Sequence, residues 1–453
     1  PPVGPLRWRA PQPVAPWSGV RDALAFGPDV PQPPFGATRA PRQDEDALYL
    51  NVWTPAVAPT KPLPVLVWIF GGGFMGGSGA DPVYDGARLA DEGAVVVTIN
   101  YRCGLFGFLA HPALAAESEH GVSGNHGLLD QLAALRWVQA NIACFGGDPG
   151  RVTAFGFSAG SASIALLLTS PHARGLFHRA ILQSPGAGRP LATLEQAQQA
   201  GLAALGPELP ALRSLSTAEV LARTGLLSPK VRALTRPRVL RPIQDGWLLP
   251  HDERTAWREG HVQRMPLLVG SNVDEGTVLT QAWQVDSVEA WRAQVADNFA
   301  GMAAEAQALY PAATDAQARA AVVAMFADTQ FNFGTRMLAR GMARMEPRTW
   351  KYLFVRKRPG QADGPHHGAE VGHVFGNLGA EGLPFDADDE ALSQTVRRAW
   401  VAFARNGQPG VPGWAPYRVA EDNHLALGER LAPEGGWRRE QLDLIERYYE
   451  RRA

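Results

Sequence analysis

Short apolar runs alternate along this chain with longer segments in which apolar residues recur at helical spacing. Runs that are continuous and rich in β-branched residues predict buried strands, and these lie at 64–70, 94–101, 151–157, 179–183, 266–270 and 351–355. Residues 46–53 alternate between apolar and polar, which predicts a further strand. Helical spacing predicts helices at 127–142, 159–170, 396–407 and 438–450.

Strands that alternate with helices predict an α/β fold, with a mostly parallel central sheet covered by helices on both faces. Two Ala-rich segments, 191–235 and 284–345, have a helical pattern and fit cap insertions better than sheet. Residues 1–45 are rich in Pro and Gly and are expected to wrap the surface. Because the chain shows neither a repeat nor a low-complexity linker, we expect residues 1–453 to form a single catalytic domain with helical excursions.

Net charge, apolar runs and cysteine content indicate which binding partners and which cellular compartment to expect. The net charge is −1, so nothing in the charge balance calls for nucleic acid or an anionic membrane. The sequence contains no apolar run long enough to span a membrane, and its first ten residues lack the apolar core of a signal peptide. The chain begins without Met, as expected if a leader had been removed or left out. Two cysteines, Cys103 and Cys144, form no disulfide framework, which favours a reducing compartment.

The stretch "RVTAFGFSAGSASI" (151–164) carries the strongest chemical signal. Ser158 stands between Gly156 and Gly160, at the predicted junction of a strand and a helix. A nucleophile at the top of a parallel sheet needs a sharp, strained turn with tight packing on either side, and glycine two residues away on each side permits that packing. The pattern alone is weak, but its strand–turn–helix context favours Ser158 as a nucleophile.

A serine nucleophile also needs donors for the oxyanion that develops in the reaction. The run "VWIFGGGFMGGSG" (67–79) places glycines directly after a predicted strand. We therefore expect the N–H groups of Gly72, Gly73 and Ala159 to form an oxyanion hole. A phosphate-binding loop is the rival interpretation, but the Lys-Ser/Thr pair that should follow is absent. A loop that is merely flexible is the other alternative.

An acid and a base should come from loops that follow later strands, since open α/β sheets place functional groups at those strand ends. Glu275 and Asp274 both lie on the polar loop after 266–270 and are the candidate acids. The loop after 351–355 holds three candidate bases, which are His366, His367 and His373. From the residues alone, these alternatives stay open.

The motifs together resemble those of the type B carboxylesterases, the cholinesterase-like branch of the α/β-hydrolases, which includes bacterial para-nitrobenzyl-esterase-like members. The resemblance covers most of the chain. It rests on "PPVGPLRW", "PWSGV", "EDALYLNVW" (45–53), "FGGGF" (70–74), "NYRCGLFGF" (100–108), "FGGDPGRVTAFGFSAG" (145–160), "VGSNVDEG" (269–276) and "HGAEVGHVFG" (367–376).

The resemblance implies the α/β-hydrolase fold and ester hydrolysis on a small-molecule ester, without a metal or another cofactor. The family motif puts the acid at Glu275 and the base at His367, which with Ser158 gives the chain order expected of this fold. An acyl-enzyme intermediate then follows. The resemblance also pairs Arg7 with Glu45 in a buried ion pair. Ser184 is expected either to bond the acid or to be a plain turn residue, and Asp148 to be a turn residue.

Departures from the family pattern bear on compartment and substrate. Ala47 replaces a cysteine that closes a loop in many relatives, so we expect a cytoplasmic, bacterial enzyme. Phe157 stands where cholinesterases have an acidic residue, which argues against a choline-ester site. Phe70, Phe74 and Trp283 are expected to add aromatic surface near the pocket. Uncharged apolar esters are therefore the expected substrates.

Two other functions compete with a serine esterase. A non-catalytic, cholinesterase-like adhesion protein would share the fold but usually lack triad residues, and all three are present here. An amidase or peptidase could use the same triad, and nothing in the sequence separates amide from ester substrates. The oligomeric state is likewise open.

Overall fold

A nine-stranded sheet organises the structure, a computed structural model that describes residues 1–228 and 233–452. Part of the expected excursion at 191–235 thus lies outside the described residues. The strands are β1 (Leu50–Trp53), β2 (Leu63–Ile69), β3 (Val95–Ile99), β4 (Gly147–Phe157), β5 (Arg179–Gln183), β6 (Leu267–Asn272), β7 (Thr349–Phe354), β8 (Asn423–Leu427) and β9 (Ala432–Gly435).

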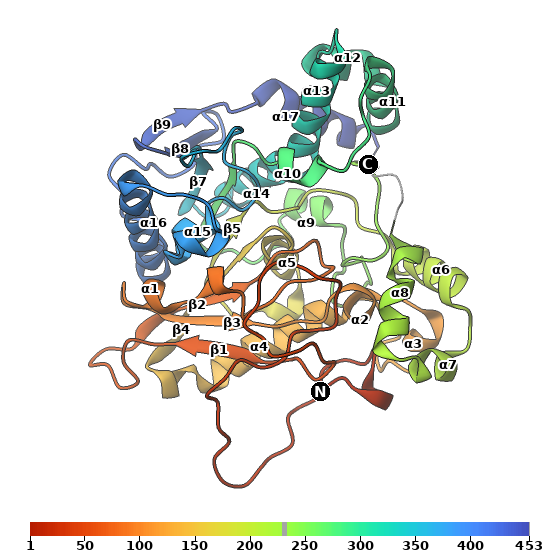
Figure 1. Cartoon of the computed structure of the whole chain (residues 1–453), viewed down its shortest axis with the longest axis vertical. Helices are drawn as coiled ribbons and strands as arrows, with labels where there is room; N and C mark the ends of the chain where they lie inside the picture. The colour runs from red at the N-terminus through yellow and green to blue at the C-terminus, as the bar shows by residue number, and fades with distance from the viewer. Residues whose placement is uncertain (229–232, 453) are drawn as a thin grey trace.

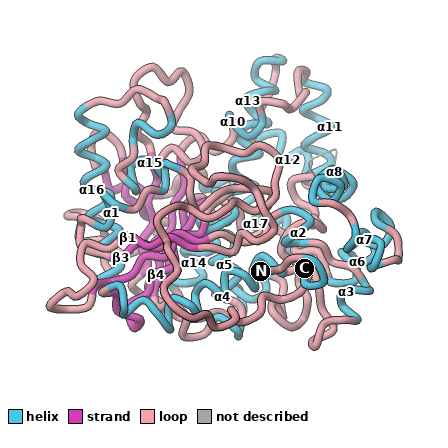
Figure 2. Tube along the Cα trace, turned by 60° about the horizontal axis from the view of Figure 1, so that its bottom comes forward, coloured by secondary structure: helices cyan, strands magenta, loops and turns pink. Residues whose placement is uncertain are grey.

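The strand order is β1-β3-β2-β4-β5-β6-β7-β8-β9. The pairings from β3 through β8 are parallel, and only the edge strands β1 and β9 pair in the antiparallel direction. Figure 2 shows these strands gathered in one sheet among the helices. The predicted mostly parallel sheet is therefore confirmed, and the carboxyl ends of β4, β5, β6 and β7 meet at one edge.

Helices connect the strands and cover the sheet (Figure 1). They are α1 (Ala87–Ala90), α2 (Gly104–Phe108), α3 (Pro112–Ala116), α4 (His126–Asn141), α5 (Ala159–Leu167), α6 (Leu194–Leu205), α7 (Leu209–Ser214), α8 (Thr217–Leu227), α9 (Glu253–Glu259), α10 (Thr277–Thr280), α11 (Val288–Asn298), α12 (Ala303–Leu309), α13 (Asp315–Ala327), α14 (Phe333–Ala343), α15 (Val371–Phe375), α16 (Ala387–Asn406) and α17 (Arg439–Glu450). A π-helical turn, η5 (Asp328–Asn332), joins α13 to α14.

The register of the central strands separates the two faces of the sheet. Trp68, Phe155 and Ile181 are paired neighbours on β2, β4 and β5, so their side chains share one face. On that face α16 packs, since its Trp400 donates a hydrogen bond to the side chain of Gln183.

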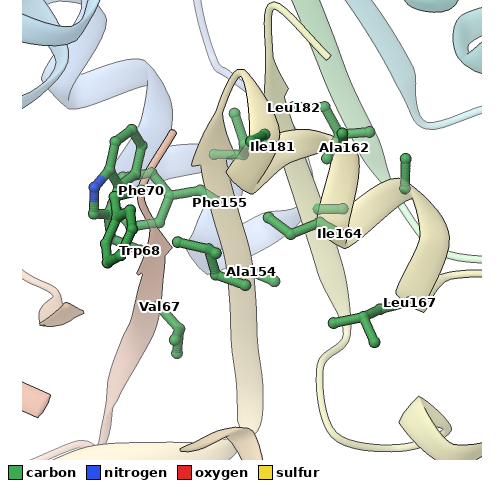
Figure 3. Packing of buried hydrophobic residues seen from close by; sticks show 14 of the residues in the cluster. Val67, Trp68, Phe70, Ala154, Phe155, Ala162, Ile164, Leu167, Ile181 and Leu182 are labelled. Carbon is green, nitrogen blue, oxygen red and sulfur yellow. The ribbon is translucent and has the colours of Figure 1, made fainter. Parts of the chain in front are cut away.

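The opposite face carries α5. In Figure 3, Ile164 and Leu167 on this helix lie beside strand residues such as Ala154, away from the Trp68–Phe155 pair. Both faces are thus buried, which explains why β2 and β3 appear in the sequence as continuous apolar runs.

The helices of the two expected excursions occupy separate places in Figure 1. Helices α6, α7 and α8 cluster beside α2 and α3, and α11, α12 and α13 cluster beside α17. Helix α14 differs from these, because it packs against β6 and β7 and belongs to the layer that covers the sheet. The division of the chain into domains stays a prediction.

Some predicted boundaries were wrong. The strand expected at 46–53 begins only at Leu50, and the helix expected at 396–407 begins nine residues earlier, where Asp386 caps a strongly polar first turn. Strands β8 and β9 were missed. Both strands are short. β9 is the edge strand and is mostly exposed, whereas β8 is mostly buried but has only three consecutive apolar residues.

Several smaller expectations are met, and one is not. Arg7 and Glu45 form a largely buried ion pair at 2.5 Å. Asp148, expected as a turn residue, lies instead near the start of β4, where it accepts a hydrogen bond from the N–H of Gly150. Both cysteines are free thiols, with Cys103 buried and Cys144 exposed. Within the described part of the chain, no helix combines the length and the apolar character needed to cross a bilayer.

Candidate active site

Ser158 sits in a strained turn between β4 and α5. Its backbone has φ +55° and ψ −118°, a left-handed region that costs a residue with a side chain about 1–3 kcal/mol. A Cβ added to Gly160 would lie 1.9 Å from the carbonyl oxygen of Ile69, and one added to Gly156 would lie 2.7 Å from the same atom. The two glycines therefore let the turn pack directly against the end of β2.

Ser158, His367 and Glu275 form a continuous chain of hydrogen-bond contacts. Nε2 of His367 lies 2.9 Å from Oγ of Ser158. Nδ1 of the same ring contacts Oε2 of Glu275. The Glu275 side chain is fully buried, and its other oxygen accepts hydrogen bonds from the hydroxyl of Ser184 and the N–H of Asn272, both at 2.6 Å. The hydrogen bond considered for Ser184 is thus present.

The neighbouring candidates lie elsewhere. Asp274 accepts a hydrogen bond at 3.0 Å from the N–H of Thr277, the first residue of helix α10. Nδ1 of His366 contacts the carbonyl of His367, and His373 lies against Asp389 and the carbonyl of Ala369. Adjacent residues therefore differ in their contacts. Glu275 and His367 belong to the hydrogen-bonded series that includes Ser158, whereas Asp274 and His366 do not.

The glycine-rich loop after β2 has two successive glycines with positive φ angles. Gly72 has φ +125° and Gly73 has φ +63°, conformations that glycine adopts without strain. A Cβ on Gly72 would lie 2.0 Å from the carbonyl oxygen of Gly76, so only glycine fits. Among the described residues, the N–H groups of Gly72, Gly73 and Ala159 meet no protein acceptor, which leaves them available to a ligand.

Aromatic rings enclose the imidazole of His367. Its centroid lies 4.5 Å from that of Phe157 and 4.2 Å from that of Phe331. Phe331 in turn contacts Phe326, which packs edge-on against Trp283, so the expected aromatic surface extends to Trp283. Two aromatic walls of this kind limit the access of water to the imidazole.

Phe70 does not belong to this surface, and its expected place near the pocket was wrong. It is fully buried and stacks on Tyr101 with the ring centroids 4.4 Å apart. Phe74 is also almost fully buried, and its backbone adopts φ +66°. Its ring borders the small cavity described below.

Sequence reasoning missed a second buried carboxyl beside the site. Glu370 accepts hydrogen bonds from the side chains of Asn272, at 2.7 Å, and Gln183, at 3.3 Å. Burial and then the charge of Glu275 raise the pKa of Glu370 to about 7. These polar residues come from β5, β6 and the turn before α15, so no local pattern marks them. Their one signal is polar character within otherwise apolar runs, as at Gln183.

The arrangement can perform acyl transfer. It offers a hydroxyl next to an imidazole, a carboxylate that holds the other ring nitrogen, and unpaired N–H donors close to the hydroxyl. Among the residues that the structure describes, no group of three or more His, Cys, Asp or Glu side chains is placed to hold a metal ion.

Comparison with known proteins gives a consistent result. A family model described as the carboxylesterase family matches residues 1–445. Fumonisin B1 esterase from Sphingopyxis macrogoltabida is 45% identical over 424 residues, which cover 90% of this chain and 77% of that protein. Para-nitrobenzyl esterase from Bacillus subtilis (strain 168) is 39% identical, covering 96% of this chain and 90% of that protein.

A solved structure titled PNB esterase superimposes with a TM-score of 0.85 at 36% identity. The superposition covers 98% of this chain and 93% of that one. The likeness therefore extends over nearly the whole fold.

Proposed function

This chain belongs to the carboxylesterase family and is a carboxylic ester hydrolase, and we propose from that premise that Ser158, His367 and Glu275 are its catalytic triad. The observation that carries the proposal is the uninterrupted contact from the hydroxyl of Ser158 through the imidazole of His367 to the carboxylate of Glu275. It supports His367 as base over its neighbours, because neither His366 nor His373 contacts Ser158 among the described residues.

In the first half of the reaction, Nε2 of His367 takes the proton of Ser158 as Oγ attacks the ester carbonyl. The carbonyl oxygen becomes an oxyanion, which the N–H groups of Gly72, Gly73 and Ala159 bind. One such donor is worth about 10²–10³-fold in kcat. His367 then gives its proton to the leaving alcohol, and the acyl group stays on Ser158.

In the second half, water attacks the acyl-enzyme while His367 again takes a proton, and the carboxylic acid product leaves. Glu275 keeps the imidazole in the tautomer that bears hydrogen on Nδ1 and stabilises the imidazolium. The hydrogen bonds from Ser184 and Asn272 hold this carboxylate in place.

The strain at Ser158 supports the same role. A half-buried serine with φ +55° persists only because the surrounding structure enforces it, and strain of this kind collects at functional sites. The conformation exposes Oγ at the edge of the sheet where His367 and Glu275 also lie.

The experiment that tests the nucleophile is covalent labelling. A fluorophosphonate should add once to the wild-type protein and not to Ser158→Ala, as measured by intact-protein mass. Ser161→Ala is the matched control, because Ser161 lies one turn further along and bonds only backbone carbonyls of Ser158 and Gln183. Labelling of Ser158→Ala at the wild-type rate would mean that another residue attacks.

The rival amidase or peptidase activity can be measured with the same protein. We expect 4-nitrophenyl butyrate to be hydrolysed far faster than 4-nitrobutyranilide, because the triad's general acid must protonate a much poorer leaving group in the anilide. Comparable kcat/KM values for the two would favour the amidase.

A further inference from the structure

A cavity next to Ser158 has an unusual lining for an enzyme expected to act on uncharged esters. The cavity itself has a volume of about 40 Å³ and opens to solvent. Four of its lining residues are arginines: Arg189, Arg236, Arg238 and Arg241. The whole chain has 43 Lys and Arg against 44 Asp and Glu, so this concentration does not reflect a basic protein.

Arginines outnumber acidic residues in this lining. Among the described lining residues, the one carboxyl is that of Glu253, which is buried and accepts a hydrogen bond from the N–H of Gly188 at 2.7 Å. Burial raises the pKa of Glu253 to about 8. At pH 7 this group is therefore largely neutral, whereas guanidinium groups stay charged.

The cavity adjoins the proposed nucleophile. Ala162 lines it, and the N–H of Ala162 donates to the carbonyl of Ser158 at 2.9 Å, so the two residues are one helical turn apart. Phe74 also lines it and directly follows Gly73 of the proposed oxyanion hole. The guanidinium of Arg241 lies over the Phe74 ring at 5.7 Å.

The same neighbours indicate which part of an ester would enter. The leaving alcohol has to face Nε2 of His367, whose ring is flanked by Phe157 and Phe331, and neither of these rings is part of the cavity lining. The cavity instead adjoins α5 and the glycine-rich loop, which supply the oxyanion donors. An ester carbonyl bound to those donors therefore directs its acyl part toward the arginines.

We propose that this enzyme prefers esters whose acyl part carries a free carboxylate, such as half-esters of dicarboxylic acids, and that the arginines beside Ser158 bind this carboxylate. Guanidinium groups suit the task because they bind carboxylates through paired N–H donors. The proposal rests on the proposed function. The sequence predicts a preference for uncharged esters, because no carboxylate stands beside Ser158. The proposed preference differs from that prediction because the cavity brings arginines close to Ser158.

The chemistry is ordinary ester hydrolysis. Oγ of Ser158 forms a bond to the ester carbon, the bond from that carbon to the alkoxy oxygen breaks, and the alcohol leaves with the proton carried by His367. Water then cleaves the acyl-serine bond and restores the proton to Ser158. The products are the alcohol and a dicarboxylate, and no other reactant is consumed.

Two substrates that differ in one negative charge test the proposed preference for a carboxylate on the acyl part. Monoethyl glutarate and ethyl 4-carbamoylbutanoate have nearly the same shape and differ in a carboxylate against a carboxamide. We expect kcat/KM for the carboxylate to exceed that for the carboxamide at least tenfold at 20 mM salt, and this ratio to fall at 500 mM NaCl because salt screens the attraction. A ratio of one or less in the wild-type protein would overturn the proposal.

A second pair tests the acyl side. Here the carboxylate or carboxamide lies on the alcohol part, in the butyryl esters of 4-hydroxybutanoate and 4-hydroxybutanamide. We expect a ratio near one for this pair, and a larger ratio than for the glutarate pair would overturn the assignment to the acyl part. If the wild-type protein hydrolyses none of the four esters, nor 4-nitrophenyl butyrate, the proposed function itself fails.

Variants of the lining arginines test whether the cavity determines the carboxylate-to-carboxamide ratio of kcat/KM. Arg236 is exposed at the cavity, so Arg236→Glu should fold, and Arg238→Gln provides a milder change. We expect each variant to lower the carboxylate-to-carboxamide ratio for the glutarate pair, Arg236→Glu by at least tenfold. Arg136→Glu is the matched control, since Arg136 is exposed on α4 and does not line the cavity. An unchanged ratio in both cavity variants, or an equal fall in Arg136→Glu, would overturn the proposal.

Discussion

Replacement of Glu275 by glutamine tests how the hydrogen bonds around the proposed acid control the imidazole. One carboxylate oxygen contacts Nδ1 of His367, and the other accepts from Ser184 and from the N–H of Asn272. A glutamine side chain puts one acceptor, its oxygen, and one donor, its NH₂, at the positions of the two carboxylate oxygens. If its oxygen stays with the two donors, its NH₂ faces Nδ1 and makes this nitrogen an acceptor. The hydrogen then moves to Nε2, which can no longer accept the proton of Ser158.

The opposite amide orientation is unfavourable. It would point the NH₂ at the N–H of Asn272 and leave that buried donor without an acceptor, at a cost of about 1–3 kcal/mol. The unproductive tautomer therefore dominates, and the charge that stabilises the imidazolium is also lost. The corresponding change in a serine protease triad lowers kcat about 10⁴-fold. We expect Glu275→Gln to lower kcat/KM about 10³–10⁴-fold, which corresponds to about 4–5.4 kcal/mol at 1.36 kcal/mol for each factor of ten.

The assay is the initial rate of 4-nitrophenyl butyrate hydrolysis at pH 8, with near-ultraviolet circular dichroism as the check of the fold. Asp274→Asn is the matched control, because asparagine can still accept the hydrogen bond from Thr277. It should stay within a few fold of the wild-type rate. Activity of Glu275→Gln within tenfold of wild type, or an equal loss in Asp274→Asn, would refute the assignment.

Three further predictions concern packing, pH and substrate. Gly160→Ala should destabilise the fold by about 1–3 kcal/mol or more in urea unfolding, because its Cβ would overlap the carbonyl of Ile69. Gly175→Ala, with φ +76° and open space around it, should cost only about 1–2 kcal/mol. Because the pKa of Glu253 is raised from 4.5 to about 8 by burial, the stability it contributes should fall as pH rises between those values. Glu253→Gln should therefore gain stability relative to wild type between pH 5 and pH 9, by up to about 1.4 kcal/mol per pH unit. A neutral butyl-type ester should exceed its isosteric choline ester in kcat/KM, and a tenfold advantage of the choline ester would contradict this substrate class.

The sheet was predictable from sequence because its central strands are buried on both faces. Such strands must be apolar throughout, so β5 was predicted at its observed bounds and β2 to within one residue. The edge strand β9 carries no such requirement, and β8 beside it has only three consecutive apolar residues, so both were missed. The first half of α16 was missed for a related reason, since its polar first turn faces solvent and is recognisable only as a capped helix start.

Some features of the candidate site could likewise be predicted from the sequence, and others could not. The tight turn at Ser158 was predictable because its glycine neighbours are a steric requirement of that turn, and the requirement is local. The contacts that support Glu275 come from β5 and β6, and only the sheet brings them together. The four cavity arginines lie in segments around 189 and 236–241, and an isolated arginine in a loop resembles an ordinary solvated residue. These arginines lie close together only in the folded tertiary structure, which no local sequence pattern encodes.

The exposed thiol of Cys144 provides a single attachment point for chemistry on this enzyme. It precedes β4, whereas Ser158 follows the same strand, and β4 spans eleven residues. Gly147 and Gly156 on β4 pair with Leu63 and Ile69 on β2, which are six residues apart, so at about 3.3 Å per residue the two ends of β4 are separated by roughly 20 Å. The only other cysteine of the chain, Cys103, is buried, and burial raises the pKa of its thiol well above the ordinary value, so it reacts poorly. A maleimide-coated support or a fluorophore would therefore couple at Cys144, with the mouth of the active site facing away from the surface.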